Sequence, residues 1–280
     1  MSEKLRTYKK HPLSLVFFIL VCLACLAAVG VFVMLVGYIL IRGIPYLKPS
    51  LFALEYTTEN VSMTPAIITT LEMVGISLLI AVPLGVSCAI YLVEYAKRGN
   101  KLVKIIRVTT ETLSGIPSII YGLFGMLFFV TALKWRYSIL AGSFTVAIMI
   151  LPLIIRSTEE ALKTVDDSYR EGSFGLGAGK LRTVFRIVLP SSVAGIFSGI
   201  ILAIGRIIGE TAALIYTSGT IAKMPTSVMD SARTLSIHMY ALSGEGLHMD
   251  EAAATAVVLL VTVFCLNGIA ALIEKKLKNS

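Results

Sequence analysis

Two ionisable side chains interrupt a segment of the chain that is otherwise apolar. Arg206 and Glu210 lie within residues 191–217, a stretch long and apolar enough to cross a bilayer. A charged side chain at membrane depth costs about 2.5–3.5 kcal/mol on insertion scales, so a chain seldom carries one without a use. The pair therefore predicts a protein that moves or senses a polar solute across a membrane.

Helical periodicity gives this pair a common face. At about 100° per residue, a face roughly 60° wide holds the pair. The same face carries three small residues: Gly195, Gly199 and Ala213. Small residues let neighbouring helices approach closely, so we expect Arg206 and Glu210 to point into protein or into a water-filled path, away from lipid.

Two interpretations of the pair remain open. A guanidinium presents planar, permanently charged donors that suit the oxygens of an anion. Arg206 would then offer a transient partner to a transported anion, and Glu210, one helical turn away, would hold that arginine between cycles. Alternatively, the two residues form a structural interhelical ion pair that contacts no ligand.

Other apolar segments carry a second carboxylate and several helix breakers. Glu72 lies about two turns into residues 66–93, where it could reach a solvent path or the Arg206 pair, or lie at the membrane interface. Four residues are expected to bend or unwind helices: Pro83, Gly115, Pro117 and Gly122. Such breaks serve either as hinges of an alternating-access pore or as packing devices.

The composition indicates the elements that position these residues. Hydrophobic residues make up 56% of the chain and charged residues 15%, which is typical of an integral membrane protein. We therefore predict an all-helical protein with six transmembrane helices. The predicted spans are residues 13–41, 66–93, 112–133, 137–155, 191–217 and 252–273.

The charge distribution predicts the orientation of these spans. Lys and Arg number 18 on one side of the membrane and 6 on the other, which places both termini in the cytoplasm by the positive-inside rule. Residues 1–41 then hold the cytoplasmic N-terminus and first helix, residues 42–65 form an external segment, and residues 66–280 form a five-helix core. That core has a cytoplasmic loop, 156–190, and an external loop, 218–250, long enough for a short surface helix. The net charge of +8 sets orientation and does not indicate nucleic-acid binding.

The chain offers little for enzymatic chemistry. Its three histidines lack metal-ligand spacing, and no nucleophile–base pair occurs at matching depth, so we predict no metal and no catalytic residue. The glycine-rich stretch 175–181 lacks the first glycine and the Ser or Thr of a nucleotide-binding loop, since Phe174 and Leu181 stand there. The chain is therefore not expected to bind ATP or any other cofactor.

The cytoplasmic loop resembles the signature of ABC-importer permeases, which reads Glu-Ala-Ala, three residues, Gly, nine residues, Ile-x-Leu-Pro. The fixed positions present here are Glu171, Gly177, Ile187, Leu189 and Pro190. Gly172 and Ser173 replace the two alanines. The resemblance implies a type I importer permease whose loop, including Arg170, forms a coupling helix in a groove of a separate ATPase that uses the ATP.

The residues before this signature predict a helix start. Asp166 and Asp167 can cap free amides, and Asp166 can pair with Arg170 one turn on. The three glycines Gly172, Gly175 and Gly177 each cost a helix about 1 kcal/mol relative to alanine. We therefore expect the coupling helix to be ordered mainly by its partner.

Four further segments resemble the PstA-type permease of phosphate-specific importers. They are residues 89–96, 114–125, 205–212 and 232–238. The resemblance implies import of inorganic phosphate, with a sister permease of PstC type, an ATPase dimer and an external phosphate-binding protein as partners. It also implies a bacterial or archaeal cytoplasmic (inner) membrane.

Two alternatives stay open at this point. The chain could be an ABC permease for another solute, which would keep the coupling loop. It could also be an ion-coupled carrier or channel that uses Arg206, Glu210 and Glu72 as its relay. Dependence on a separate ATPase distinguishes the second alternative from the importer.

Overall fold

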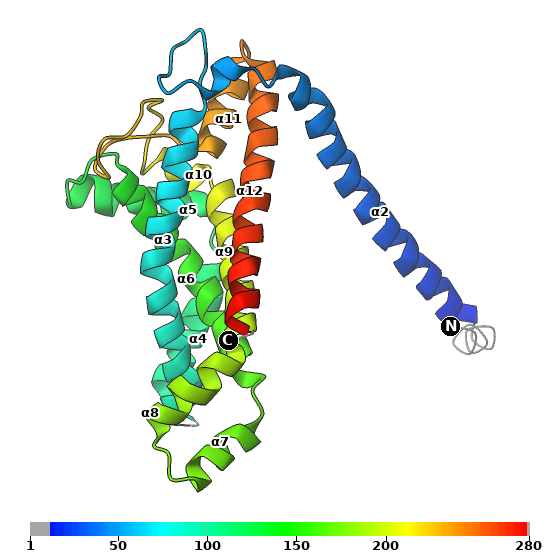
Figure 1. Cartoon of the computed structure of the whole chain (residues 1–280), viewed down its shortest axis with the longest axis vertical. Helices are drawn as coiled ribbons and strands as arrows, with labels where there is room; N and C mark the ends of the chain where they lie inside the picture. Colours follow the sequence, from blue (N-terminus) through cyan, green and yellow to red (C-terminus); the bar gives the residue numbers. More distant parts are fainter. Residues whose placement is uncertain (1–11, 98, 279–280) are drawn as a thin grey trace.

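The computed structural model describes residues 12–97 and 99–278, and within them helices are the regular elements, which confirms the predicted all-helical class (Figure 1). The N-terminal residues predicted to be cytoplasmic, before Pro12, lie outside the described residues. The α-helices are α2 (Pro12–Gly43), α3 (Thr64–Ile90), α4 (Lys101–Ser114), α5 (Ser118–Gly125), α6 (Ile139–Lys163), α7 (Asp167–Gly175), α8 (Lys180–Thr183), α9 (Leu189–Gly209), α10 (Ala212–Ile215), α11 (Leu235–Glu245) and α12 (Met249–Lys278). Short 3₁₀ turns form η1 (Ile44–Tyr46) and η2 (Pro49–Phe52), and π-helical turns form η3 (Tyr91–Tyr95), η4 (Met126–Ala132) and η5 (Val184–Val188).

Polar side chains begin several of these helices. The amide of Leu102 donates to Asn100 at the start of α4, at 2.9 Å, and the amide of Ala141 donates to Ser138 at the start of α6, at 3.2 Å. Thr234 precedes α11 in the same way. Such caps satisfy amides that have no partner within the helix, so the helix boundaries follow from local sequence.

Five helical runs are long and apolar enough to cross a membrane. These runs are Leu13–Tyr46, Thr64–Tyr95, Ile139–Lys163, Lys180–Gly209 and Met249–Leu277. A sixth candidate consists of two helices, Lys101–Ser114 and Ser118–Ala132, that are bent by 104° at the break between them. The number of predicted spans therefore agrees with the structure if the bent pair counts as one span.

The bent pair differs from the straight third span expected at residues 112–133. The search for apolar spans did not predict helix α4, because its charged residues make it amphipathic rather than apolar throughout. Gly115 and Pro117 lie at the break, where the proline ring and its missing N–H prevent α4 from continuing. In contrast, α3 continues through Pro83 and α5 continues through Gly122, so the chain is not broken at those two positions.

Helices occupy both ends of the loop 156–190 that was predicted to be cytoplasmic. Helix α6 extends to Lys163, and one helical run begins again at Lys180. Pro190 lies inside this run, although the sequence suggested that it ends the loop. Because Pro190 has no N–H to donate to the carbonyl one turn earlier, the helix widens into the π-helical turn η5 just before it.

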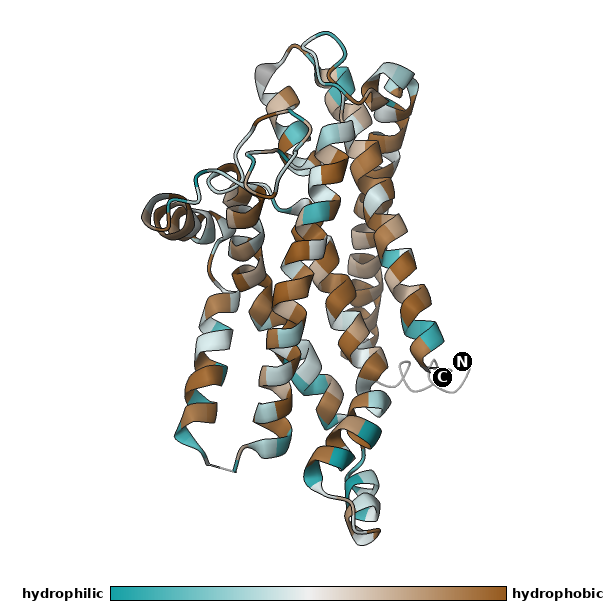
Figure 2. Cartoon of the chain, turned by 60° about the vertical axis from the view of Figure 1, so that its left-hand side comes forward, coloured by the Kyte–Doolittle hydropathy of each residue, from teal (hydrophilic) through white to brown (hydrophobic). Residues whose placement is uncertain are grey.

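The core is a bundle in which α6 packs against α3 and α9, and α9 packs against α12. Glycines permit these close contacts. A Cβ at Gly195 would overlap Ala161, and a Cβ at Gly199 would overlap Ser157, so α9 and α6 approach as the small residues of α9 predicted. Hydrophobic residues extend along the length of the long helices, as a bilayer requires (Figure 2).

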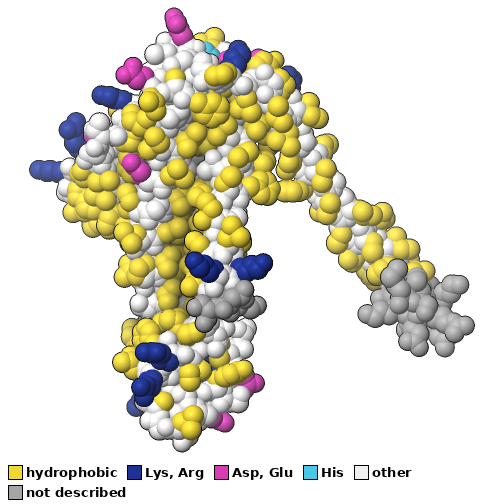
Figure 3. Space-filling view, in the orientation of Figure 1, with side chains coloured by type: hydrophobic (Ala, Val, Ile, Leu, Met, Phe, Trp, Pro, Cys, Tyr) yellow, Lys and Arg dark blue, Asp and Glu magenta, His cyan; other side chains and the backbone are white. Residues whose placement is uncertain are grey.

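Helix α2 lies apart from this bundle over most of its length (Figure 1). Its outer end packs on α12, where Gly43 contacts Ala253 and Val257. None of its most apolar stretch is buried, and hydrophobic side chains cover its surface (Figure 3). The described part of the bundle therefore leaves the most apolar stretch of α2 uncovered.

The loop that was predicted to be external is more buried than expected. Helix α11 was predicted as a surface helix, yet Leu235, Ile237 and His238 are buried, since α11 packs on α12 and α3. The guanidinium of Arg233 lies 4.7 Å from the centre of the Tyr56 ring, whose edge meets the ring of His238 at 6.2 Å. Burial, together with the positive charge of Arg233, lowers the pKa of His238 from 6.5 to about 3.

This burial predicts a pH-dependent stability. His238 stays neutral in the folded protein but takes up a proton below pH 6.5 when unfolded, so folding stability is present at pH 7 and is lost as the pH falls through 6.5 toward 3. We expect a loss of about 2 kcal/mol between pH 7 and pH 5. Thermal unfolding of the purified protein in detergent should show this loss, and His238→Gln should remove most of it. His248→Gln is the control, and an equal effect of both variants would contradict the assignment.

Candidate substrate pathway and coupling surface

The segment that carries Arg206 and Glu210 is a broken helix. Helix α9 ends at Gly209, Glu210 is extended, and α10 begins at Ala212. The Glu210 Oε1 atom accepts a hydrogen bond from the amide of Ala213 at 2.9 Å, and the Glu210 carbonyl accepts one from Ser236 Oγ at 2.6 Å. The buried carboxylate thus caps α10 and joins the break to α11.

A second broken helix lies against the first. Helix α5, which follows the break at Gly115 and Pro117, packs on α10, so that a Cβ at Gly122 would overlap Ala213. The bend is held by the Tyr121 hydroxyl, which donates to the Leu113 carbonyl at 2.8 Å. Two interrupted spans therefore meet below the outer loops, within the height of α12 (Figure 1).

Arg206 and Glu210 do not form the expected ion pair in the described part of the chain. Because α9 ends between them, Glu210 is not one helical turn further on, and its carboxylate is turned to α10. Arg206 is exposed and has no acidic partner among the described residues. Gly195 and Gly199 lie on the same face of α9 and pack against α6, whereas Arg206 further along that face is exposed.

Glu72 lies on α3 toward its external end. Its side chain is half-buried, and its Oε2 atom is buried without a hydrogen-bond partner among the described residues. No ion pair joins it to Arg206 in the described part of the chain. Among the described residues, no ion pair therefore joins any two of Arg206, Glu210 and Glu72.

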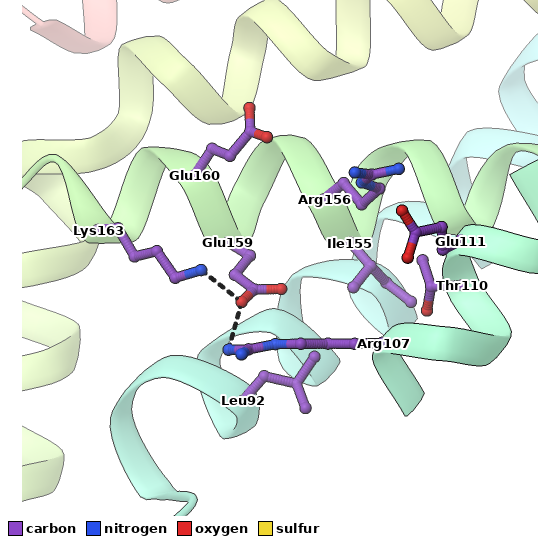
Figure 4. A pocket seen from close by; sticks show the side chains of 9 residues that line it. All are labelled: Leu92, Arg107, Thr110, Glu111, Ile155, Arg156, Glu159, Glu160 and Lys163. Atoms are coloured by element: carbon purple, nitrogen blue, oxygen red, sulfur yellow. Dashed lines mark hydrogen bonds and ion pairs between the residues drawn. The ribbon is translucent and has the colours of Figure 1, made fainter. Parts of the chain in front are cut away.

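A charged cluster at the other end of the bundle was missed by sequence reasoning. Glu159 Oε1 on α6 is 2.6 Å from Arg107 Nη2 of α4 and 2.7 Å from Lys163 Nζ (Figure 4). These residues line a cavity of about 210 Å³ with Arg156 and Glu111. The i, i+4 spacing of Glu159 and Lys163 signals half of this cluster, but the contact to Arg107 requires the fold.

The predicted coupling loop begins with a capped helix, as expected, but Arg170 has other acidic partners than the sequence suggested. Asp166 accepts from the Ser168 amide at 2.8 Å, and hydrogen bonds from Ser168 lower the pKa of this carboxyl. The expected partner of Arg170 was Asp166. Instead, Arg170 pairs with Asp167 at 3.1 Å and with Glu94 at 2.8 Å. Glu94 was not singled out from the sequence.

The signature residues surround this helix. Glu171 is exposed on α7, and Gly177 follows it with φ +82, a left-handed conformation that glycine adopts without strain. Ile187 and Leu189 are partly buried in the run that continues into α9, and Pro190 is exposed. Large apolar side chains of the loop are exposed: Tyr169, Phe174, Leu176, Leu181 and Phe185. A hollow of about 580 Å³ lies beside α7, between Tyr169 and Ile187.

The described residues contain no group of three or more His, Cys, Asp and Glu that could hold a metal ion.

Similarity to known proteins shows the family of the chain. A family model described as "Binding-protein-dependent transport system inner membrane component" matches residues 81–279. The chain belongs to this family. The permease is therefore a transport subunit and not an enzyme, and it is a multi-pass inner-membrane protein.

Individual relatives agree with this assignment. The permease is 33% identical to a "Probable ABC transporter permease protein YqgI" of Bacillus subtilis, over 88% of this chain and 89% of that protein. It is 37% identical to the "Phosphate transport system permease protein PstA" of Yersinia pestis, over 71% of this chain and 68% of that protein. The recognition of an ABC permease in the loop signature is confirmed.

A solved structure shares the fold. The permease matches a chain in the crystal structure of a bacterial alginate ABC transporter in complex with an alginate pentasaccharide-bound periplasmic protein, with a TM-score of 0.67. The match covers 98% of this chain and 99% of that chain at 16% identity. The predicted importer-permease architecture is confirmed, but a fold shared at this identity does not identify the solute.

The site geometry predicts unequal effects of the two charges on stability. Glu210→Ala should lower the free energy of unfolding by about 1–2 kcal/mol, because α10 loses its cap. Arg206→Gln should change it by less than about 0.5 kcal/mol, because that side chain is exposed and unpaired. Chemical denaturation of the purified variants in detergent measures both values. Equal losses would instead indicate a structural ion pair.

Proposed function

We propose that this permease imports inorganic phosphate at the expense of ATP hydrolysed by a separate subunit. The observation that carries the solute assignment is the similarity to the PstA relative, at 37% identity over 71% of the chain. The exposed arginine at a helix break is compatible with an anionic solute, since a guanidinium suits phosphate oxygens.

We infer that Arg206 lines the phosphate path. An arginine inside an apolar span is costly when it faces lipid, and here the chain itself leaves Arg206 exposed and without an acidic partner among the described residues. This cost is avoided if Arg206 faces water and a second permease across a shared pore. A cation without a fixed carboxylate beside it is also free to meet a passing anion.

Glu210 has a different role in this proposal. Its carboxylate caps α10 and so maintains the break at which Arg206 is presented. Glu72, with a buried carboxylate oxygen that lacks a hydrogen-bond partner among the described residues, is proposed to border the external part of the path. The break at Gly115 and Pro117 is proposed as a hinge, since irregular backbone at membrane depth is tolerated beside a water-filled cavity.

The loop 164–179 with α7 is proposed to dock on the ATPase. Its exposed apolar residues border a hollow, and such surfaces are typical of protein interfaces. The residues proposed for coupling are Arg170, Glu171, Gly177, Ile187, Leu189 and Pro190. The positive-inside rule then places this loop and both termini in the cytoplasm.

The remaining partners follow from uncovered surfaces and from the family. Helix α2 leaves its apolar stretch without cover from the rest of the chain, so we propose that a sister permease of PstC type packs on it and closes the pore. An ATPase dimer below and an external phosphate-binding protein above complete the assembly. ATP is used by the ATPase, and this chain is proposed to bind no cofactor.

Uptake of labelled phosphate tests the function. Vesicles that contain the permease, its sister, the ATPase and the binding protein should accumulate phosphate only with ATP inside. Arg206→Lys should lower uptake roughly tenfold, because an ammonium lacks the planar donors of a guanidinium. Arg136→Lys, at an exposed position of the outer loop, is the control at equal membrane abundance. Uptake without the ATPase would support an ion-coupled carrier instead, and sulfate or sugar uptake would support another solute.

The docking surface is tested with a matched pair of substitutions. Leu176 is 91% exposed beside α7, and Leu247 is 83% exposed in the external loop. Leu176→Asp should reduce copurification of the ATPase about tenfold or more, because a charge enters an apolar contact. Leu247→Asp should leave it unchanged. Equal copurification of the ATPase with both variants would place the docking surface elsewhere.

A further inference from the structure

The coupling helix is bonded to a transmembrane span through one side chain. Arg170 of α7 donates to Glu94 Oε1 from Nε at 3.1 Å and from Nη2 at 2.8 Å. Glu94 belongs to η3, the last turn of the span Thr64–Tyr95. The two side chains are only 14% and 7% exposed, so water weakens this pair little.

Arg170 also reaches the end of a second span. Its Nη1 donates to the Val165 carbonyl at 2.7 Å, and its Nη2 donates to the Leu162 carbonyl at 3.0 Å. These carbonyls lie at the C-terminal end of α6, where helix carbonyls lack partners within the helix. The guanidinium therefore joins α7 to both α6 and the end of α3.

Other contacts do not replace this link. The main packing of α7 is with α8 and η5, and Ser173 bonds to Thr183 of α8. Among the described residues, no other side chain of α7 bonds to α3, η3 or α6. The far end of the same loop meets η3 one residue further on, where Lys180 Nζ lies 5.2 Å from the centre of the Tyr95 ring.

Helix α3 extends this connection across the protein. It packs along α6, and near its external end Thr70 Oγ1 accepts a hydrogen bond from the Leu235 amide of α11 at 2.9 Å. Glu72 lies on the same helix. A displacement of the lower end of α3 would therefore be carried to the external part of the pathway, which is tied through Ser236 of α11 to Glu210.

We propose that Glu94 is the positioning residue through which the coupling helix moves α3, so that the Arg170–Glu94 pair links ATP hydrolysis to opening of the pathway. The proposal rests on the proposed function and adds to it the residue that receives the movement. Neither residue needs to touch phosphate or nucleotide. Loss of the pair should uncouple transport from hydrolysis, while the ATPase stays bound through the exposed apolar residues of the loop.

The experiment measures phosphate uptake and ATP hydrolysis in the same vesicles of the complete assembly. Glu94→Gln keeps the size of the side chain and removes its charge. We expect the phosphate imported per ATP hydrolysed to fall roughly tenfold, within the range typical of coupling between sites, with ATPase copurification and hydrolysis within about twofold of the unmodified protein. Glu111→Gln is the matched control, because Glu111 is exposed on α4, outside the proposed docking loop, so this variant should leave the ratio unchanged.

Three results in the Glu94→Gln variant would overturn the proposal. Unchanged uptake in Glu94→Gln, or an equal fall of uptake and hydrolysis, would show that the pair does not transmit movement. Loss of the bound ATPase would show that Glu94 only shapes the docking surface. Absence of phosphate uptake by the unmodified assembly would instead refute the proposed solute, and the ratio between the variants would then be measured with the solute that is imported.

Discussion

Backbone groups inside a bilayer have no water to bond, and this constraint governs where the helices of this permease can break. The break after Gly209 is held by protein groups, because the Glu210 carboxylate caps α10 and Ser236 bonds to the Glu210 carbonyl. The Tyr121 hydroxyl likewise donates a hydrogen bond to the carbonyl of Leu113 beside the other break. Both interruptions are thus built into the packed interior.

This arrangement places the two charges of α9 in different environments. The Glu210 carboxylate caps α10. The Arg206 guanidinium is exposed and has no acidic partner among the described residues. In a membrane such an arginine needs contact with water or with another subunit. The apolar stretch of α2 is likewise not covered by the described part of the bundle. The described part of the chain thus leaves both an apolar helix surface and a charged side chain uncovered.

At the end of the bundle that carries α7, charged side chains connect elements that are not neighbours in sequence. Arg170 bonds to Glu94 across 76 residues, and Arg107 of α4 pairs with Glu159 of α6. Each link joins a loop or amphipathic helix to the end of a span. The Arg170–Glu94 pair is largely removed from water, so it holds the end of its span in a defined geometry, which a subunit driven by another protein requires.

The sequence by itself determined the membrane class, the number of spans and the permease family, because hydropathy over a window and a motif of fixed spacing are local properties. It also predicted the close contact of α9 through Gly195 and Gly199. Only the tertiary structure decided that Arg206 and Glu210 are unpaired, that α4 is a separate helix, and that Glu94 receives Arg170. Spacing on an ideal helix assumes that the helix continues, and it does not at Gly209. Contacts between residues far apart in the chain depend on how the helices pack, which no local pattern contains.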